Sequence, residues 1–193
     1  MGIADVDWRL QIGGHAIRKE RLNYNDGMLA LRFAGLLAVA VWFGGLVALG
    51  AIAAPAIFDV TASGQVGGGR MAAGALFGEI LGRFHLVGYA CGAVLLLSLS
   101  ARAVLGPRPR HFALAAVTTS LMLAAALYSG IVLSGRIEHL REEIGEVPSS
   151  LPENDPRRVE FGRLHAQSTA FQLVPLFGGL VLLFREMTDC EKL

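Results

Sequence analysis

Charged residues are scarce in this chain. They make up 17% of its 193 residues, whereas roughly 25% is typical of a soluble domain. The few charges nearly cancel, leaving a formal net charge of +1 at pH 7. A protein that binds nucleic acid needs a basic face to neutralise phosphates. The composition therefore argues against a nucleic-acid partner and favours a protein that lies in a lipid bilayer.

Cysteine and the usual catalytic motifs are also missing. The two cysteines are Cys91, inside an apolar run, and Cys190, in the polar tail, so we expect no disulfide between them. The sequence has no Ser-His-Asp set, no paired carboxylates in an apolar run and no nucleotide fingerprint. We therefore predict no catalytic residue and favour a protein that is not an enzyme.

Long apolar runs dominate the sequence instead. Residues 33–58, 112–135 and 166–184 carry no charge, and residues 86–105 carry only Arg102. A helix needs roughly 20 residues to cross the hydrocarbon core of a bilayer. Lipid cannot hydrogen-bond a bare backbone, so such runs must be helical. The sequence predicts an all-α bundle of four transmembrane helices, with spans of about 31–58, 84–105, 111–135 and 164–184.

The remaining segments complete the predicted organisation. Residues 1–28 form a polar N-terminal segment, residues 29–185 the transmembrane domain with an outer loop at 136–163, and residues 186–193 a tail. The first run is too long for a signal peptide, whose apolar region has about 7–15 residues. In the outer loop, apolar residues at helical spacing extend the third helix outward, and Asp155 followed by Pro156 is typical of a helix start.

A repeated motif precedes two of the runs. Gly-Arg-Phe-His at 82–85 and Gly-Arg-Leu-His at 162–165 lie 80 residues apart, before the second and the fourth span. Both spans begin on the outer side and run in parallel, so the repeat indicates two hairpins related by a pseudo-two-fold axis. Chance agreement of four residues in a chain rich in glycine and arginine is the alternative.

The two histidines of this motif are the candidate ligand residues. Ionisable side chains in a span usually face the bundle interior, and imidazole binds copper, zinc and haem iron. We therefore expect His85 and His165 to point inward, within about 15 Å of each other, as candidate metal or ligand residues. The alternative is that each only hydrogen-bonds a neighbouring helix or lies among the headgroups. The polar residues that share a helical face with one or the other are Tyr89, Ser168, Thr169 and Gln172.

Two segments resemble a known family. They are VWFGGLVALGAIAAPAIF at 41–58 and EFGRLHAQSTAFQLVPL at 160–176. They are similar to the signatures of transmembrane-protein-205-like proteins, small four-span membrane proteins whose domain has no known function. That family resembles copper-resistance-protein-D-like domains and HemJ-type protoporphyrinogen oxidases, some of which hold metal or haem on membrane histidines. The resemblance implies haem or copper as possible cofactors. It matches Trp42, Gly45, Pro55, Phe58, His165 and Ser168, and His85 is carried over as well.

Small residues and two larger ones suggest how the helices pack. Gly88-x-x-x-Gly92 and Ala40-x-x-x-Gly44-x-x-x-Ala48 allow helices to approach closely. Such faces also offer a route to a homo-oligomer. Trp42 lies well inside its run and is expected to pack in the bundle. Pro55 either kinks the first helix, freeing carbonyls towards a cavity, or ends it.

Three functional hypotheses follow. The first is a non-enzymatic binding or transport-associated protein with a small polar site in the outer half of the bundle. The second is a haem- or copper-binding redox protein using His85 and His165. The third is a structural membrane partner with no ligand. The lipid bilayer is the one partner that the composition itself implies.

Topology is the first testable prediction. Ten basic residues lie on the side of the termini and seven on the other, so the positive-inside rule places both termini in the cytoplasm of a bacterial inner membrane. Reporter fusions at residues 1 and 193 should be cytoplasmic, and a fusion at Ser150 should not be. A cytoplasmic signal at Ser150 with external termini would invert this topology.

Overall fold

The computed structural model describes residues 4–64, 67–106 and 111–190, with side chains from residue 25 to residue 188. All regular secondary structure in these ranges is helical. The elements, in chain order, are α1 (Ala4–Ala48), the π-helix η1 (Leu49–Ala53), α2 (Ala54–Ala62), α3 (Gly69–Leu105), α4 (Phe112–Leu127), the π-helix η2 (Tyr128–Leu133), α5 (Ser134–Ile144), the 3₁₀-helix η3 (Pro148–Ser150) and α6 (Pro156–Cys190).

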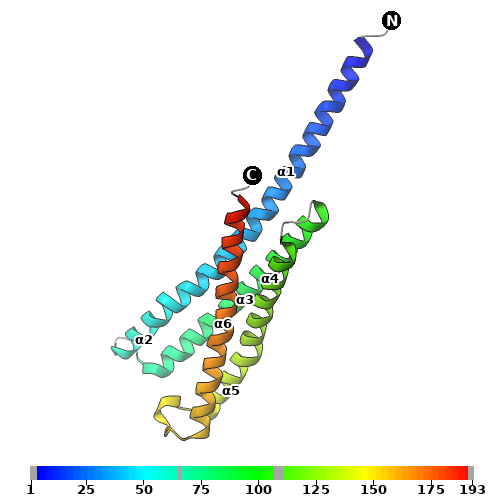
Figure 1. Cartoon of the computed structure of the whole chain (residues 1–193). Coiled ribbons are helices and arrows are strands. Elements are labelled where there is room, and N and C mark those ends of the chain that lie inside the picture. Colours follow the sequence, from blue (N-terminus) through cyan, green and yellow to red (C-terminus); the bar gives the residue numbers. More distant parts are fainter. Residues whose placement is uncertain (1–3, 65–66, 107–110, 191–193) are drawn as a thin grey trace.

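These elements form four long rods, because η1 joins α1 to α2 and η2 joins α4 to α5 without a break. The main contacts are α1 with α3, α3 with α4, α4 with α6 and α6 with α1. The α2–α3 and α5–α6 connections lie at one end of the bundle and both termini lie towards the other, so α3 and α6 run in the same direction (Figure 1). The predicted all-α four-helix bundle is confirmed.

Each rod contains a helix long and apolar enough to cross a membrane. The candidate spans are Asn25–Ala62, Gly69–Leu105, Phe112–Ile144 and Pro156–Thr188. The outer faces of the rods are apolar, and among their exposed side chains are Leu86, Leu97, Ile131 and Phe177. So much exposed apolar surface is unfavourable in water and favourable in lipid. The chain is a multi-pass membrane protein whose helices extend beyond the spans that the sequence predicts.

The α5–α6 end of the bundle has its own apolar cluster. Leu133, Leu140 and Ile144 pack with Leu151 and Leu164, which confirms the predicted outward extension of the third rod. Gly145 ends α5 with a left-handed backbone, φ 69°. Glycine adopts this conformation without steric cost and commonly ends helices. The helix therefore ends at Ile144.

The first rod passes Pro55 without stopping. Pro55 lies in the first turn of α2, directly after the π-helical turn η1. Proline has no N–H to donate to the carbonyl four residues earlier, and a π-helical turn changes the hydrogen-bond spacing at this point. The side chain of Pro55 is exposed. The expectation of a helix stop is wrong, and Pro55 contributes nothing to the interior.

The start of α6 follows the sequence signal. A side-chain oxygen of Asp155 accepts a hydrogen bond of 2.8 Å from the backbone N–H of Arg157, and the two side chains form an ion pair of 3.0 Å. These contacts satisfy an N–H that a helix leaves free in its first turn. Hydrogen bonds from Arg157 also hold the pKa of the Asp155 carboxyl below its usual value.

This cap gives a pH-dependent prediction. Because the pKa of Asp155 is lower in the folded chain than in the unfolded chain, its stabilising effect is present above the unfolded value, about 3.9. The effect is lost as the pH falls through the folded value. Asp155→Ala should lower the thermal midpoint in detergent at pH 7, and the difference from the wild type should shrink towards pH 3.

Glu153→Ala is the matched control, since Glu153 is an exposed acid of the same loop. It should leave the midpoint unchanged at both pH values. Equal effects of the two substitutions at pH 7 would contradict the capping role of Asp155.

Candidate functional site

The indole of Trp42 fills the centre of the bundle. Trp42 on α1 is 2% exposed and packs in a cluster with Val39, Cys91, Leu95 and Met122. Its ring lies over Gly88 and Gly92 of α3, where an added Cβ would come within 2.9 Å and 3.2 Å of indole atoms, respectively. The two glycines therefore make room for a side chain from the neighbouring helix. The predicted packing role of Trp42 is confirmed.

A small cavity lies next to this indole and is bounded by all four rods. Its volume is about 10 Å³, roughly the space that one water molecule requires. Trp42 on α1, His85 on α3 and Ala126 on α4 line it, together with Gln172 and Pro175 on α6. Both polar and apolar groups thus meet at one point inside the bundle.

His85 is the ionisable residue of this cavity. Its side chain is buried, and Nδ1 has no hydrogen-bond partner among the described residues. The ring stacks on Tyr89, one turn further along α3, with 6.2 Å between ring centroids. A buried polar atom without a partner costs about 1–3 kcal/mol. The inward orientation expected for His85 is confirmed, and its ring keeps an unused hydrogen-bonding atom.

The π-helix η2 supports the far side of His85. Gly130 lies in η2, and a Cβ added there would come within 2.8 Å of Cγ of His85 and would overlap the hydroxyl of Tyr89. That hydroxyl donates a hydrogen bond of 3.4 Å to the carbonyl of Ala126. Single π-helical turns inside α-helices occur frequently at functional sites. Here the turn places glycine where the imidazole needs space.

A second polar contact joins the third rod to α6. The hydroxyls of Ser129 and Ser168 lie 3.2 Å apart and share a hydrogen bond, and both residues are buried. The Ser134 hydroxyl donates to the Ser129 carbonyl at 3.0 Å, within the π-helical turn. Ser129 and Ser168 thus join two rods of the bundle. Ser168 is buried as the polar face of α6 predicted.

His165 does not join His85 in the interior. It is exposed on α6, and its ring stacks on Phe161 of the same helix, with 6.3 Å between centroids. Buried positions of α6 include Leu164, Ser168 and Leu182. An α-helix turns by about 100° per residue, so His165 lies well round from the face that contains Leu164. The prediction that both rings point inward is wrong for His165.

The repeated motif therefore differs between its two copies. His85 is buried on α3, whereas in the second copy Leu164 is buried and His165 is exposed. The arginine also pairs differently: Arg83 contacts Glu79, four residues earlier, and Arg163 contacts Glu160, three residues earlier. The interior face thus contains the fourth residue of the motif on α3 and the third residue on α6. Four matching letters do not give two equivalent sites.

The other predicted positions divide in the same way. Gln172 is half-buried at the cavity, whereas Thr169 is exposed and its hydroxyl donates to the His165 carbonyl of the same helix.

Two residues at the site, Pro175 and Gly130, were not predicted from the sequence. Pro175 interrupts the hydrogen bonding of α6 beside the cavity, because it has no N–H to donate to the Phe171 carbonyl. The sequence signal for Pro175 was a proline inside an apolar span.

The residues at this site do not fit haem or a shared metal ion. Among the described residues, no group of three His, Cys, Asp or Glu side chains is placed to hold a metal ion. His85 and the exposed His165 do not share a pocket. A cavity of about 10 Å³ is also far below the size of a cofactor pocket, roughly 300 Å³ or more. The arrangement suits a ligand of very few atoms.

Comparison with known protein families assigns this chain to one of them. The profile of a domain of unknown function, DUF4149, matches residues 37–146, more than half of the chain. The chain belongs to this family. The DUF4149 region contains Trp42, His85 and Gly130, and it ends before α6, which supplies Gln172 and Pro175. No curated protein and no solved structure matches the chain.

The packing around His85 gives a stability prediction. Gly130→Ala places a methyl group against the rings of His85 and Tyr89, and overpacking of this kind costs about 1–3 kcal/mol. The substitution should lower the thermal midpoint of the purified protein in detergent.

Gly135→Ala is the matched control. Gly135 lies on the same rod with no atom within 4 Å of an added Cβ, and alanine is favoured over glycine in a helix by up to about 1 kcal/mol. Its midpoint should be equal to or above that of the wild type. A Gly130→Ala protein as stable as the Gly135→Ala protein would contradict the described contact.

Proposed function

We propose that this DUF4149 protein is a non-enzymatic membrane protein that binds a small polar ligand inside the bundle, at His85, in association with transport. The observation that carries the proposal is the unused Nδ1 of a buried imidazole beside a cavity that all four rods bound. Ionisable groups inside a membrane bundle typically mark a substrate or ion pathway.

The surroundings limit the ligand to a small hydrogen-bonding molecule. His85 and Gln172 are the polar lining residues of the cavity, while Trp42, Phe84 and Pro175 supply an apolar wall. Neutral imidazole can donate from one nitrogen and accept at the other. A ligand with one or two polar heavy atoms satisfies this pattern, and a larger one requires the helices to separate.

A purely structural role for His85 is the main alternative. A histidine with a purely structural role normally has its buried polar atoms paired. Leaving one of them without a partner costs more stability than replacing the whole hydrogen bond by apolar groups. At His85 the stacking on Tyr89 supplies packing but leaves Nδ1 without a partner. This combination favours a ligand over a structural hydrogen bond.

The second candidate is the haem or copper protein that the resemblance to copper-resistance-protein-D-like and HemJ-type domains implies. The buried imidazole of His85 is its supporting feature. His165 would have to reach this site by a rotation of α6. This candidate predicts a coloured or metal-containing protein.

Two finer features complete the proposal. We propose that both termini lie in the cytoplasm and His85 in the outer half of the membrane, and the excess of basic residues on the terminal side supports this orientation. The small residues Ala40, Gly44 and Ala48 are exposed on α1 and form a face on which a second copy could pack.

The test compares wild type and His85→Leu, purified in detergent. Leucine removes the imidazole and keeps an apolar side chain, so its thermal midpoint should equal or exceed that of the wild type. Ammonium and formate, which have one and two polar heavy atoms, serve as small polar probes. At least one should raise the wild-type midpoint in a saturable way, and neither should raise that of His85→Leu.

His165→Leu is the matched control and should keep the wild-type response, since His165 is exposed. A large loss of stability in His85→Leu, with no probe that shifts the wild type, would make His85 a structural residue. A Soret absorbance band in the wild type that His85→Leu lacks would favour the haem protein instead.

A further inference from the structure

A second polar cluster lies at the opposite end of the bundle, and its residues come from three helices. Arg32 of α1 and Arg102 of α3 both contact the carboxylate of Glu186 on α6, at 2.9 Å and 3.3 Å. Arg102 is 17 residues beyond His85 on α3, roughly 25 Å at 1.5 Å per residue. This cluster is therefore separate from the cavity at His85.

The ion pairs around Glu186 hold the end of the bundle together. Nη2 of Arg32 also donates to the Glu186 carbonyl at 3.4 Å, so α1 and α6 are joined twice. The side chains of Arg32, Arg102 and Glu186 are 21%, 16% and 26% exposed. Partial burial makes such pairs stronger than exposed ones. Glu186 thus already compensates the charge of these two arginines in part.

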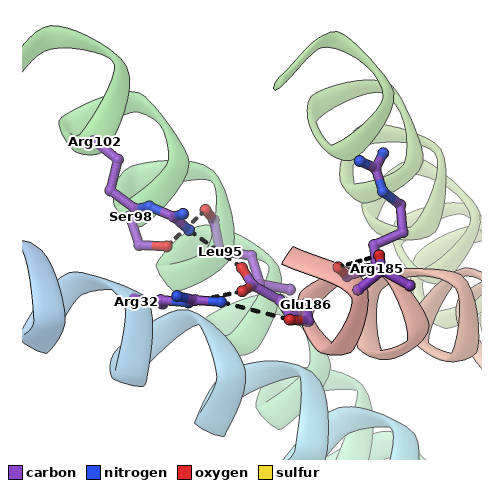
Figure 2. Close-up of polar contacts among 7 residues, drawn as sticks. Arg32, Leu95, Ser98, Arg102, Arg185 and Glu186 are labelled. Carbon is purple, nitrogen blue, oxygen red and sulfur yellow. Dashed lines mark hydrogen bonds and ion pairs between the residues drawn. The ribbon is translucent and has the colours of Figure 1, made fainter. Parts of the chain in front are cut away.

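Arg185 is a third guanidinium and takes no part in these pairs. Figure 2 shows its side chain directed away from the Arg32–Glu186–Arg102 contacts. Its Nη1 is buried and has no hydrogen-bond partner among the described residues. A guanidinium carries five N–H donors and is always charged. Nη1 of Arg185 is therefore a charged donor that no described residue satisfies.

A cavity joins these groups. Its volume is about 60 Å³, and Arg102, Arg185 and Glu186 supply its charged wall. Leu36, Leu99 and Leu182 are among its apolar lining residues. The space exceeds the roughly 10–15 Å³ that a single water molecule requires. One wall of the cavity thus suits a charged group and the other suits hydrocarbon.

The cavity also lies at the membrane boundary. Arg32 immediately precedes the first uncharged run, Arg102 lies near the end of the second, and Arg185 directly follows the fourth. This is the depth at which lipid headgroups meet acyl chains. Basic pockets between transmembrane helices bind phosphorylated headgroups, and the planar arginine fork matches phosphate oxygens.

We propose that this cavity binds a phosphate group, with Arg185 and Arg102 as its donors, and that the apolar wall selects the phosphate of an anionic lipid. A phosphodiester supplies a negative charge for Arg185 and Arg102 and acceptors for Nη1 of Arg185. Free phosphate shares the same chemistry, so the experiment must distinguish the two sources.

The experiment measures the thermal midpoint of the full chain in detergent at fixed ionic strength. The midpoint is followed in three titrations, with phosphatidylglycerol, with phosphatidylcholine and with inorganic phosphate. Phosphatidylglycerol should raise it in a saturable way and more than phosphatidylcholine does. Arg185→Gln should raise the half-saturating concentration roughly tenfold, as expected for the loss of a charged hydrogen bond.

Arg163→Gln is the matched control. It removes an arginine from the other end of α6, where Arg163 is exposed and pairs only with Glu160 at 3.6 Å among the contacts described. Its half-saturating concentration should equal that of the wild type. A response to inorganic phosphate with the same dependence on Arg185, and no further effect of phosphatidylglycerol, would support the phosphate site with a soluble source.

Two results would overturn the proposal. One is the absence of a saturable shift with any of the three titrants, and the other is the same response in Arg185→Gln and Arg163→Gln. Arg185→Lys keeps the charge and serves if Arg185→Gln does not fold. It should bind phosphatidylglycerol more weakly than the wild type, because it lacks the fork, and wild-type binding by Arg185→Lys would contradict the role of Arg185.

Discussion

The contact between the Trp42 indole and the glycine face of α3 is the interaction on which the interior depends. Gly88 and Gly92 leave space that the indole occupies, so α1 and α3 are held at a distance set by an aromatic ring. The same ring forms one wall of the cavity at His85. A side chain at Gly88 would displace the indole, which lines the same cavity as His85. Packing and the candidate site are therefore one arrangement.

Hydrogen bonding sets the second constraint, because lipid cannot satisfy a buried polar group. Most polar side chains inside the described bundle are paired: Ser129 with Ser168, and Thr119 with the Ala115 carbonyl. Two buried side-chain atoms in the described residues lack a partner, Nδ1 of His85 and Nη1 of Arg185. The residue of each lines a cavity, His85 within the bundle and Arg185 at the end where the termini lie. The two proposals rest on these two atoms and are independent of each other.

Much of the fold could be predicted from the sequence, because bilayer thickness and backbone hydrogen bonding leave few choices for four uncharged runs. The start of α6 followed from Asp155 and Pro156, whose effect is local. The site was harder. His165 and Ser168 lie on one broad face of α6, and only the neighbouring helices decide which part of that face is buried. The cluster around Glu186 requires three helices to place charged residues at the same depth. The predicted topology suggests this common depth, but the residue spacing along each helix does not show that these side chains meet.

The most direct test of this account is solid-state NMR of the protein in lipid bilayers, with isotope-labelled histidine, tyrosine and glycine. We expect the His85 ring to contact Tyr89 and Gly130 and to show no contact with acyl-chain protons. The His165 ring should contact lipid or water protons and should show no contact with His85. Acyl-chain contacts at the His85 ring, or a direct contact between the two histidine rings, would contradict the central claim that one histidine lies inside the bundle and the other outside it.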